Sequence, residues 1–414
     1  MIAWLLACGP KVDIGPVPVE TWASPAPVVH VNTTNDPDIH LLAMVRAGSG
    51  FDPIGEEGLA WLVAHALPAP LEVSVDTEWV TARLRCPRSE ASRCIATFAE
   101  AVTTPRFEDW STLQQAALTR IETPSSLADE VLHAVLFEGH RTGHPGAGRS
   151  GVVPSLTPEQ GQSFFEQHYR RATFVAGTAG AEAEAWADAL AEALLVIPSG
   201  PPADAAWIRP PTFASRGLVV LPPPVDEAPT DVRAGQVLRL APDHADWVAL
   251  HVGVAALDAR LKTALGQQAF ATLDAGPANP KDPTRVRRTV TLRVGASAIG
   301  NSLEMLDVLV SQVERWHEQG LGDAEFTRIR DNLPAAWTPQ TTERALAEAV
   351  AEHAAGWPLW PVSPLSSLLR GQVDGAIKRW VSPNRFQHVM AGNPEVTDER
   401  FGDNVVELPM DPFR

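Results

Sequence analysis

The chain has 414 residues, enough for two or three domains with sizeable apolar cores. Its hydrophobic content of 45% and charged content of 20% are typical of a globular protein and exclude wholesale disorder, despite 37 prolines. The formal net charge of -17 leaves no broad basic surface, so nucleic acid is not expected as a partner.

The chain begins with a short apolar stretch that ends in Leu5-Leu6-Ala7-Cys8. The stretch is shorter than the roughly 20 residues that span a bilayer. It is similar to a bacterial lipobox, in which Cys8 would be lipidated, although no Lys or Arg precedes it. Residues 1–27 are therefore predicted to be a signal or lipobox with a Pro-rich tether. Lipidation would place the protein in the bacterial cell envelope or periplasm, whereas a chance match would leave it cytoplasmic.

The first half alternates strand and helix patterns. An apolar run at 39–47 predicts a strand, and the glycines that follow it predict a turn before a helix near Gly58. Residues 80–86 alternate between apolar and polar side chains, which predicts a half-buried strand. Further helices are predicted at 89–102, 111–122, 125–137, from 157 onward and at 181–195, with a strand at 173–177.

Cys86 and Cys94 lie at the end of the alternating strand and inside the helix pattern after it. In an exported protein they could form a disulfide, and the alternative is a pair of buried thiols. Only three cysteines are present and none form a CxxC motif, which excludes a thiolate zinc site.

Five prolines between positions 198 and 216 predict a linker, after which a second series of elements begins. Strands are predicted at 218–221, 235–240 and 286–294, and helices at 246–265, 302–319 and 323–333. The two series also end alike, because 168–177 and 380–392 each read as a helix end that runs into a strand and a glycine. This repeat predicts two copies of one α+β unit, at 28–197 and 217–414, joined by the linker 198–216.

Five blocks, taken in order along the chain, carry a resemblance to a known family: 46–53 with its Gly-Ser turn, Gly58-Leu59-Ala60, 137–148, 164–179, and 257–265 with Arg260-Leu261. In these blocks the chain resembles the M16 family, which includes insulinase, pitrilysin and the mitochondrial processing peptidase. The resemblance implies an α+β fold of two homologous domains, each a mainly antiparallel sheet covered by helices.

The family's zinc motif, H-x-x-E-H, places two metal-binding histidines on one face of a helix and a general-base glutamate beside them. In this chain, Trp61 and Ala64 stand where the resemblance implies the first histidine and the glutamate, and His65 stands at the second histidine. The third ligand aligns with Arg120, although Glu122 is close by. One histidine cannot supply a three-ligand catalytic site, so the resemblance implies neither a bound metal nor a catalytic residue.

Active members of the family also supply an Arg and a Tyr from the second domain to hold the substrate backbone. The corresponding positions here are Gly266 and Leu273, and the only tyrosine of the chain is Tyr169. Both parts of the family's active site are therefore predicted to be degenerate.

Two other patterns in the sequence could mark a site. His133, His140 and His144 lie close together in sequence and could hold a metal if the helix at 125–137 continued, but Gly139 predicts that it ends. Residues 146–151 match GxGxxG, yet no strand precedes them and no helix pattern follows directly, so a chance match is predicted.

The degenerate positions and the resemblance together predict a non-catalytic M16-like subunit with no cofactor. The resemblance further implies that it pairs with a zinc-bearing M16 subunit to enclose peptides. One alternative is an active zinc endopeptidase that holds metal through His65 and other residues. The other is a lipid-anchored envelope protein that binds peptides or another protein without turnover. In each case, a membrane would be contacted only through a lipid anchor at Cys8.

Overall fold

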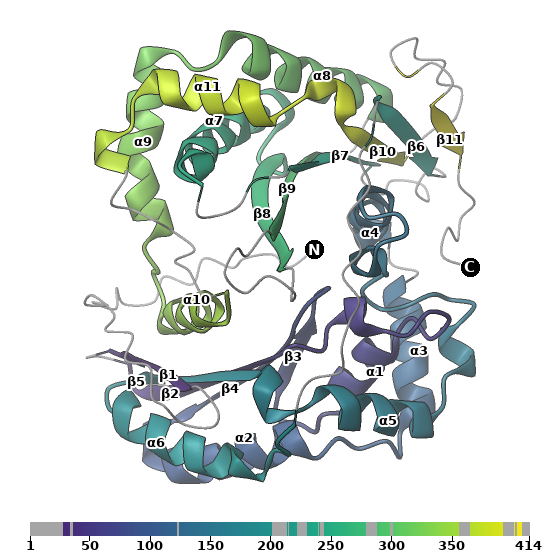
Figure 1. The fold of residues 1–414 in the computed structure, drawn as a ribbon, viewed down its shortest axis with the longest axis vertical. Helices are drawn as coiled ribbons and strands as arrows, with labels where there is room; N and C mark the ends of the chain where they lie inside the picture. Colours follow the sequence, from purple (N-terminus) through teal and green to yellow (C-terminus); the bar gives the residue numbers. More distant parts are fainter. Residues whose placement is uncertain are drawn as a thin grey trace. The chain divides into compact units, whose positions relative to one another are not determined.

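The computed structural model describes residues 28–33, 36–121, 124–200, 213, 215–221, 230–238, 240, 244–278, 288–298, 301–355, 365–391, 401 and 404–407. The chain forms two compact units (Figure 1). Unit 1 lies within 1–121, 144–205 and 337–360, and unit 2 takes the rest. The predicted domains 28–197 and 217–414 differ from these units in two segments, 122–143 and 337–360. The predicted tether 1–27 and most of the predicted linker lie outside the described residues.

Unit 1 contains a five-stranded, mainly antiparallel sheet. Its order is β1 (Val28–Asn32), β5 (Phe174–Gly180), β2 (Asp38–Val45), β4 (Val80–Pro87) and β3 (Glu72–Val75). Only β1 and β5 are parallel. The predicted strands at 39–47 and 80–86 are confirmed as β2 and β4.

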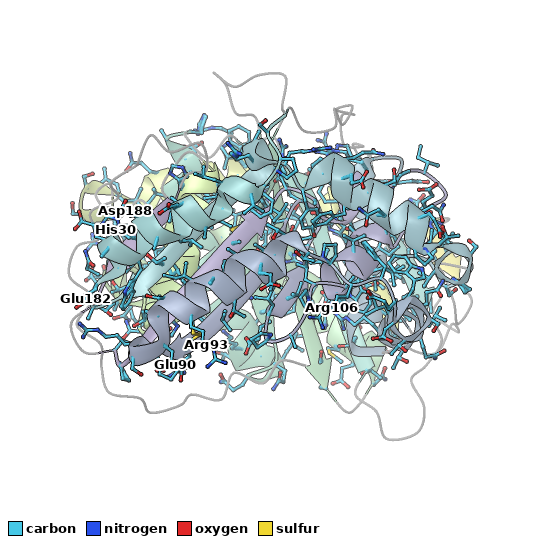
Figure 2. All side chains as sticks on the ribbon, turned by 90° about the horizontal axis from the view of Figure 1, so that it is seen from below. His30, Glu90, Arg93, Arg106, Glu182 and Asp188 are labelled. Atoms are coloured by element: carbon cyan, nitrogen blue, oxygen red, sulfur yellow. A yellow bond between two sulfur atoms is a disulfide. The ribbon has the colours of Figure 1, made fainter. Side chains whose placement is uncertain are left out.

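Both faces of this sheet are apolar, so both need a cover. Ile39, Leu41 and Ala43 of β2 belong to one core, whereas Leu42 and Met44 belong to the other. The first core is closed by α1 (Leu59–His65), α2 (Ala91–Thr103), α3 (Trp110–Ile121), α5 (Pro158–His168) and α6 (Ala183–Ala193). Charged side chains line the outer side of α2 and α6 and the turns before them, including Glu90, Arg93, Glu182 and Asp188 (Figure 2).

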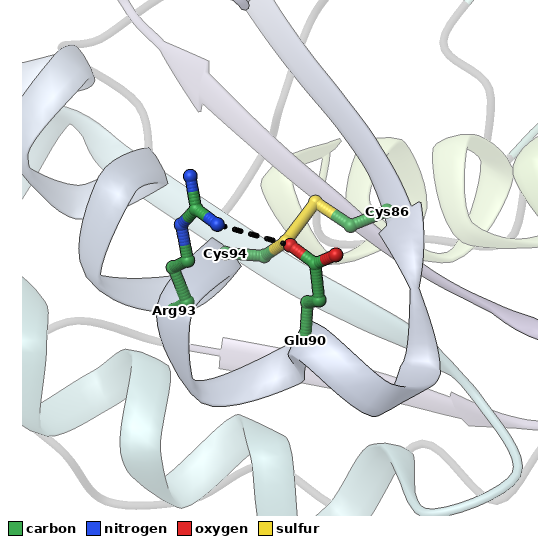
Figure 3. Close-up of a disulfide and its surroundings, with 4 residues drawn as sticks. All are labelled: Cys86, Glu90, Arg93 and Cys94. Atoms are coloured by element: carbon green, nitrogen blue, oxygen red, sulfur yellow. Dashed lines mark hydrogen bonds and ion pairs between the residues drawn. A yellow bond between two sulfur atoms is a disulfide. The ribbon is translucent and has the colours of Figure 1, made fainter.

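A disulfide joins Cys86 at the end of β4 to Cys94 in α2 (Figure 3). The two Cα atoms are 6.5 Å apart, and both side chains are buried beneath the exposed Arg93–Glu90 pair. Val80, Ala82 and Leu84 are buried on the same face of the strand as Cys86, as the alternation predicts. Of the two alternatives for these cysteines, the structure has the bridge.

Unit 2 repeats the topology of unit 1. Its sheet has the order β11 (Val405–Glu407), β6 (Gly217–Leu221), β10 (Gln387–Ala391), β7 (Thr230–Leu238), β9 (Arg288–Ala298) and β8 (Phe270–Ala278). The last five strands match β1-β5-β2-β4-β3 in order and direction. Its helices include α7 (Asp246–Leu265), α8 (Ser302–Gln319), α9 (Asp323–Trp337) and α11 (Arg370–Trp380). The predicted repeat is therefore confirmed.

Two helices are exchanged between the halves of the sequence: each belongs to the compact unit that is formed mainly by the other half. The helix α4 (Pro124–Leu136) packs on β7 and β10 of unit 2, and α10 (Thr342–Ala355) packs on β1, β2 and β5 of unit 1. Each covers apolar residues on the second face of its sheet, which explains why the compact units are not contiguous in sequence. Among the described residues, no helix has the length and apolarity needed to cross a membrane.

Candidate functional site

The loop before α1 is held against the turn between β3 and β4. Gly48 and Ser49 donate backbone hydrogen bonds to the carbonyl oxygens of Glu78 and Asp76. A Cβ atom at Gly48 would lie 2.3 Å from the Asp76 oxygen, so only glycine allows this approach. The Gly-Ser turn thereby fixes where α1 begins.

Asp52 caps α1 from within this loop. Its carboxylate oxygens accept hydrogen bonds from the N–H groups of Gly58 and Ala60, each at 2.7 Å. Burial raises the pKa of Asp52 to about 8, and the two backbone donors offset this only in part. No sequence pattern predicts this cap, because Asp52 lies outside the usual N-cap spacing.

Trp61 and His65 share one face of α1. Their rings are stacked, with centroids 3.7 Å apart and an interplanar angle of 19°. The Nδ1–H of His65 donates to the carbonyl oxygen of Trp61 at 2.8 Å. Burial lowers the pKa of His65, with the backbone bond opposing the shift, so the imidazole is neutral at pH 7.

These residues do not fit a catalytic zinc ion. Trp61 has no metal-binding atom, and Ala64 offers only a fully buried methyl group at the general-base position. Arg120, near the end of α3, is an exposed cation, and Glu122 lies outside the described residues. His65 would thus be one ligand where three are needed. No group of three His, Cys, Asp or Glu side chains in the described parts of the chain is placed to hold a metal.

The two positions of the substrate-holding pair are also apolar. Gly266 is the C-cap of α7, with φ of 89° and open space around its Cα. Leu273 lies in β8 opposite Leu292. Neither residue can donate a side-chain hydrogen bond.

The three clustered histidines have separate roles. The ring of His133 hydrogen-bonds to the carbonyl oxygen of Thr142, and His140 Nδ1 accepts from the backbone N–H of Thr142. In unit 1, His144 Nδ1 donates to the carbonyl oxygen of Ser49 at 3.2 Å. The helix α4 ends at Leu136, so the predicted end of the helix before Gly139 is confirmed.

The GxGxxG match at 146–151 lacks the structure that a dinucleotide site needs. No strand precedes it, and a single 3₁₀ turn (Val153–Ser155) follows in place of an α-helix. This agrees with the prediction of a chance match.

A polar face of the unit 2 sheet was missed by the sequence analysis. It is formed by Asp231, Arg233, Thr272, Asp274, Arg293 and Ser297, which share one side of β7, β8 and β9. The available signal was Arg293 inside the predicted strand 286–294. Asp231, Arg233 and Asp274 lie outside the predicted strands, and which strands are neighbours could not be read from the sequence.

Comparisons with known proteins agree on the fold. No protein-family model matches the sequence, and no curated protein matches it. A solved peptidase M16 inactive domain from Pseudomonas fluorescens is 20% identical, with a TM-score of 0.74, over 92% of this chain and 99% of that one. A chain of complex III2 from Candida albicans is 13% identical, with a TM-score of 0.75, over 94% of this chain and 100% of that one.

The periplasmic protease PqqL from Escherichia coli is 10% identical, with a TM-score of 0.68. The similarity covers 96% of this chain and 49% of PqqL, so this chain spans about half of that protein. Together, these similarities show that the chain has the two-unit fold of M16-like peptidases, as the resemblance implied.

Proposed function

We propose that this chain is a non-catalytic M16-like subunit that pairs with a zinc-bearing M16 subunit and contributes peptide-binding surface to the complex. The observation that carries the proposal is the stacked Trp61–His65 pair beside Ala64, which replaces the zinc ligands and the general base. A solved structure of the same fold is described as an inactive domain, and another is a chain of a multi-subunit complex, which supports both parts of the proposal.

An exposed sheet edge supports peptide binding. The strand β3 is the outer strand of its sheet and packs beside α1. Its residues are alternately exposed and half-buried, with Glu72 and Ser74 on the exposed side. An extended peptide can add to such an edge through backbone hydrogen bonds, which requires no catalytic group.

We also infer an exported location. The Cys86–Cys94 disulfide supports an oxidising compartment, and one protein of the same fold is a periplasmic protease. Lipidation of Cys8 remains a further part of this proposal, and mass spectrometry of the mature N-terminus would test it.

Co-purification and metal analysis test the proposal together. The tagged chain should be coexpressed with each zinc-bearing M16 protein of its own genome and purified without reductant. We expect an equimolar complex with one of them, with zinc and peptide cleavage in the complex and neither in this chain alone. A His65→Ala variant should leave the zinc content and the cleavage rate of the complex unchanged.

The enzyme alternative gives the opposite result. One equivalent of zinc in the isolated chain, lost in the His65→Ala variant, together with chelator-sensitive cleavage, would show that this chain is itself the peptidase. Replacing the catalytic glutamate of the partner then provides the control, because it should abolish cleavage only if the partner carries the active site.

A further inference from the structure

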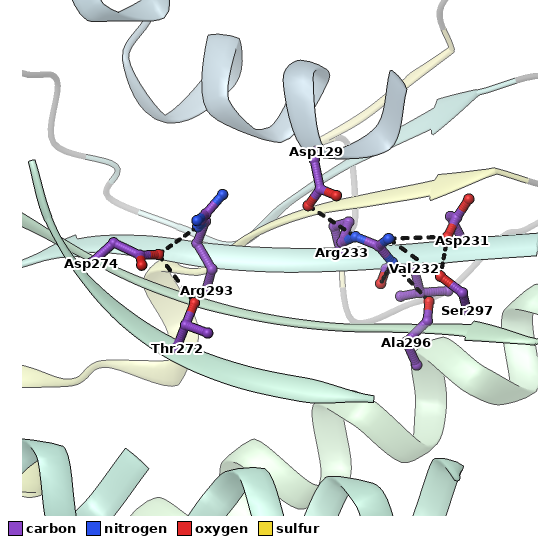
Figure 4. Close-up of polar contacts among 9 residues, drawn as sticks. All are labelled: Asp129, Asp231, Val232, Arg233, Thr272, Asp274, Arg293, Ala296 and Ser297. Carbon is purple, nitrogen blue, oxygen red and sulfur yellow. Dashed lines mark hydrogen bonds and ion pairs between the residues drawn. The ribbon is translucent and has the colours of Figure 1, made fainter. Parts of the chain in front are cut away.

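Two arginines on the polar face of unit 2 have very different surroundings (Figure 4). The opposite face of the same sheet is a dry core, in which Val290, Leu292 and Val294 are each 0% exposed. Charged side chains on the polar face therefore lie on a sheet that is packed on its other side. Side chains on such an element suit recognition of a ligand.

Every donor group of Arg233 is used. Its Nε atom donates to Asp129 of α4 at 2.9 Å. Its Nη atoms reach, in addition, the carbonyl oxygens of Val232 and Ala296, the Ser297 hydroxyl group and the Asp231 carboxylate. With only 7% of its side chain exposed, Arg233 is a structural residue that fastens α4 to the sheet.

Arg293 is held from one side only. Its Nε atom donates to Asp274 Oδ2 at 2.8 Å, and the Thr272 hydroxyl group donates to the same oxygen at 3.1 Å. No hydrogen bond or ion pair in the described part of the chain uses either Nη atom of Arg293. The side chain is 35% exposed, so these atoms can be reached from outside the core.

The guanidinium group is charged and oriented before any ligand arrives. Burial alone would lower the pKa of Arg293, but the charge and hydrogen bond of Asp274 and the charge of Asp129 outweigh it and raise the pKa. Bracing by Asp274 removes much of the rotamer entropy that a free arginine would lose on binding. In Figure 4, the only dashed line of Arg293 runs to Asp274, in contrast to the several lines of Arg233.

We propose that the two Nη atoms of Arg293 bind a carboxylate group of a peptide, either its C-terminus or an acidic side chain. The inference rests on the proposed peptide-binding function. A planar guanidinium edge with two parallel N–H donors matches the two oxygens of a carboxylate. A doubly charged phosphate fits less well, because Asp274 and Asp129 already supply negative charge near this arginine. Among the described strands, β8 is the outer strand of its sheet and the neighbour of β9, so an extended peptide that adds to β8 lies one strand away from Arg293.

Binding of matched peptides to the full chain tests the proposal. The probe is a short acetylated peptide of alternating Val and Thr, prepared with a free C-terminal carboxylate, as the C-terminal amide, and as the amide with one internal Glu. Isothermal titration calorimetry gives the three affinities. We expect the amide without Glu to bind at least about tenfold more weakly than the tighter-binding of the two carboxylate peptides.

Three variants assign that preference. Arg293→Met should abolish the difference between the acid and amide peptides, and Arg293→Lys should reduce it, because lysine keeps the charge but lacks the two-pronged edge. The control is Arg344→Met in α10, since Arg344 is equally exposed at 35% and is paired with Glu348. That variant should retain the full preference.

Equal affinity for all three peptides, or a preference that survives in Arg293→Met, would overturn the inference while leaving peptide binding and subunit pairing intact. Loss of the preference in Arg344→Met as well would also overturn it, because the effect would then be one of overall charge. The proposed function is tested separately, by co-purification with a partner and by measurement of the zinc content. Circular dichroism of each variant confirms that the fold is retained.

Discussion

The only tyrosine of the chain has a hydroxyl group without a hydrogen-bond partner among the described residues. Tyr169 is 2% exposed and packs against Phe165 and Phe174 in unit 1. Burial raises the pKa of Tyr169 well above its ordinary value. Since Tyr169→Phe removes a desolvated polar group, we expect the variant to raise the free energy of unfolding by about 1 kcal/mol. Urea denaturation followed by tryptophan fluorescence measures the change.

A second buried hydroxyl group provides the control. Thr178 is 0% exposed, and its Oγ1 donates to the carbonyl oxygen of Ala183 at 2.7 Å. Thr178→Val keeps the shape of the side chain but removes this buried hydrogen bond, so it should lower the free energy of unfolding by about 1 kcal/mol. If Tyr169→Phe is destabilising to the same degree, its hydroxyl group is hydrogen-bonded after all and the prediction is wrong.

At the residue scale, side chains that are neighbours along one helix could be predicted from the sequence. Contacts between side chains of neighbouring strands could not. Gly58-Leu59-Ala60 set the register of α1, and from it Trp61 and His65 follow as i, i+4 neighbours. The surroundings of Arg293 need Thr272 and Asp274 from another strand. That pairing is fixed by the tertiary fold, and no local pattern encodes it.

Packing of α10 on the unit 1 sheet depends on the absence of a side chain at Gly177. A Cβ atom there would lie 2.5 Å from Val350 Cγ2 and 2.7 Å from Leu346 Cδ1. Gly177→Ala should therefore push α10 away from β5 and lower the free energy of unfolding by about 1 to 3 kcal/mol. Hydrogen exchange followed by mass spectrometry should localise the lost protection to α10 and to β1, β2 and β5.

A glycine with open space around it provides the control, because its replacement by alanine changes only the backbone preference and not the packing. Gly375 lies in α11, and a Cβ atom there would meet nothing within 4 Å. Gly375→Ala should raise the free energy of unfolding by about 0.5 to 1 kcal/mol, because alanine favours the helix. Stabilisation by Gly177→Ala of similar size would contradict the tight packing of α10.

At the element scale, the sequence predicted most helices and most of the longer strands, but it did not predict β8, α10 or the exchange of α4 and α10. Periodicity identified 125–137 as a helix, and the structure has α4 there. An amphipathic helix, however, shows only that it needs an apolar partner and not which sheet supplies it. The short edge strands β3 and β11 also escaped, since four and three residues carry too little alternation.

The whole molecule combines two units of one topology whose buried ionisable groups differ. In unit 2, burial lowers the pKa of His133 and His251 to about 4 and that of His388 to about 3. In unit 1, burial raises the pKa of Asp52 to about 8 and that of Asp76 to about 6. The two units should therefore respond differently to acid, because in unit 1 the raised pKa values of the two aspartates oppose the lowered pKa of His65.

The direction in which the stability of each unit changes with pH follows from the number of protons that its folded and unfolded states bind. Between the unfolded histidine pKa of about 6.5 and the folded value near 4, the unfolded chain binds more protons, so unit 2 loses stability as the pH falls through this window. In unit 1, the folded state holds protons on Asp52 and Asp76 that the unfolded chain releases above its aspartate pKa of about 4, so the same acidification favours folding.

Lowering the pH from 7 to 5 should therefore open unit 2 before unit 1. We expect a loss of about 1 to 2 kcal/mol for each buried histidine of unit 2. Hydrogen exchange, corrected for the intrinsic rate at each pH, should show reduced protection in α7 and β10 and retained protection in β2 and β4.

The variant His388→Asn should weaken the pH dependence of protection in unit 2. The asparagine amide can donate to the Gly217 oxygen as His388 Nδ1 does, but it does not titrate. Equal loss of protection in both units, unaffected by His388→Asn, would mean that the buried histidines do not control acid stability.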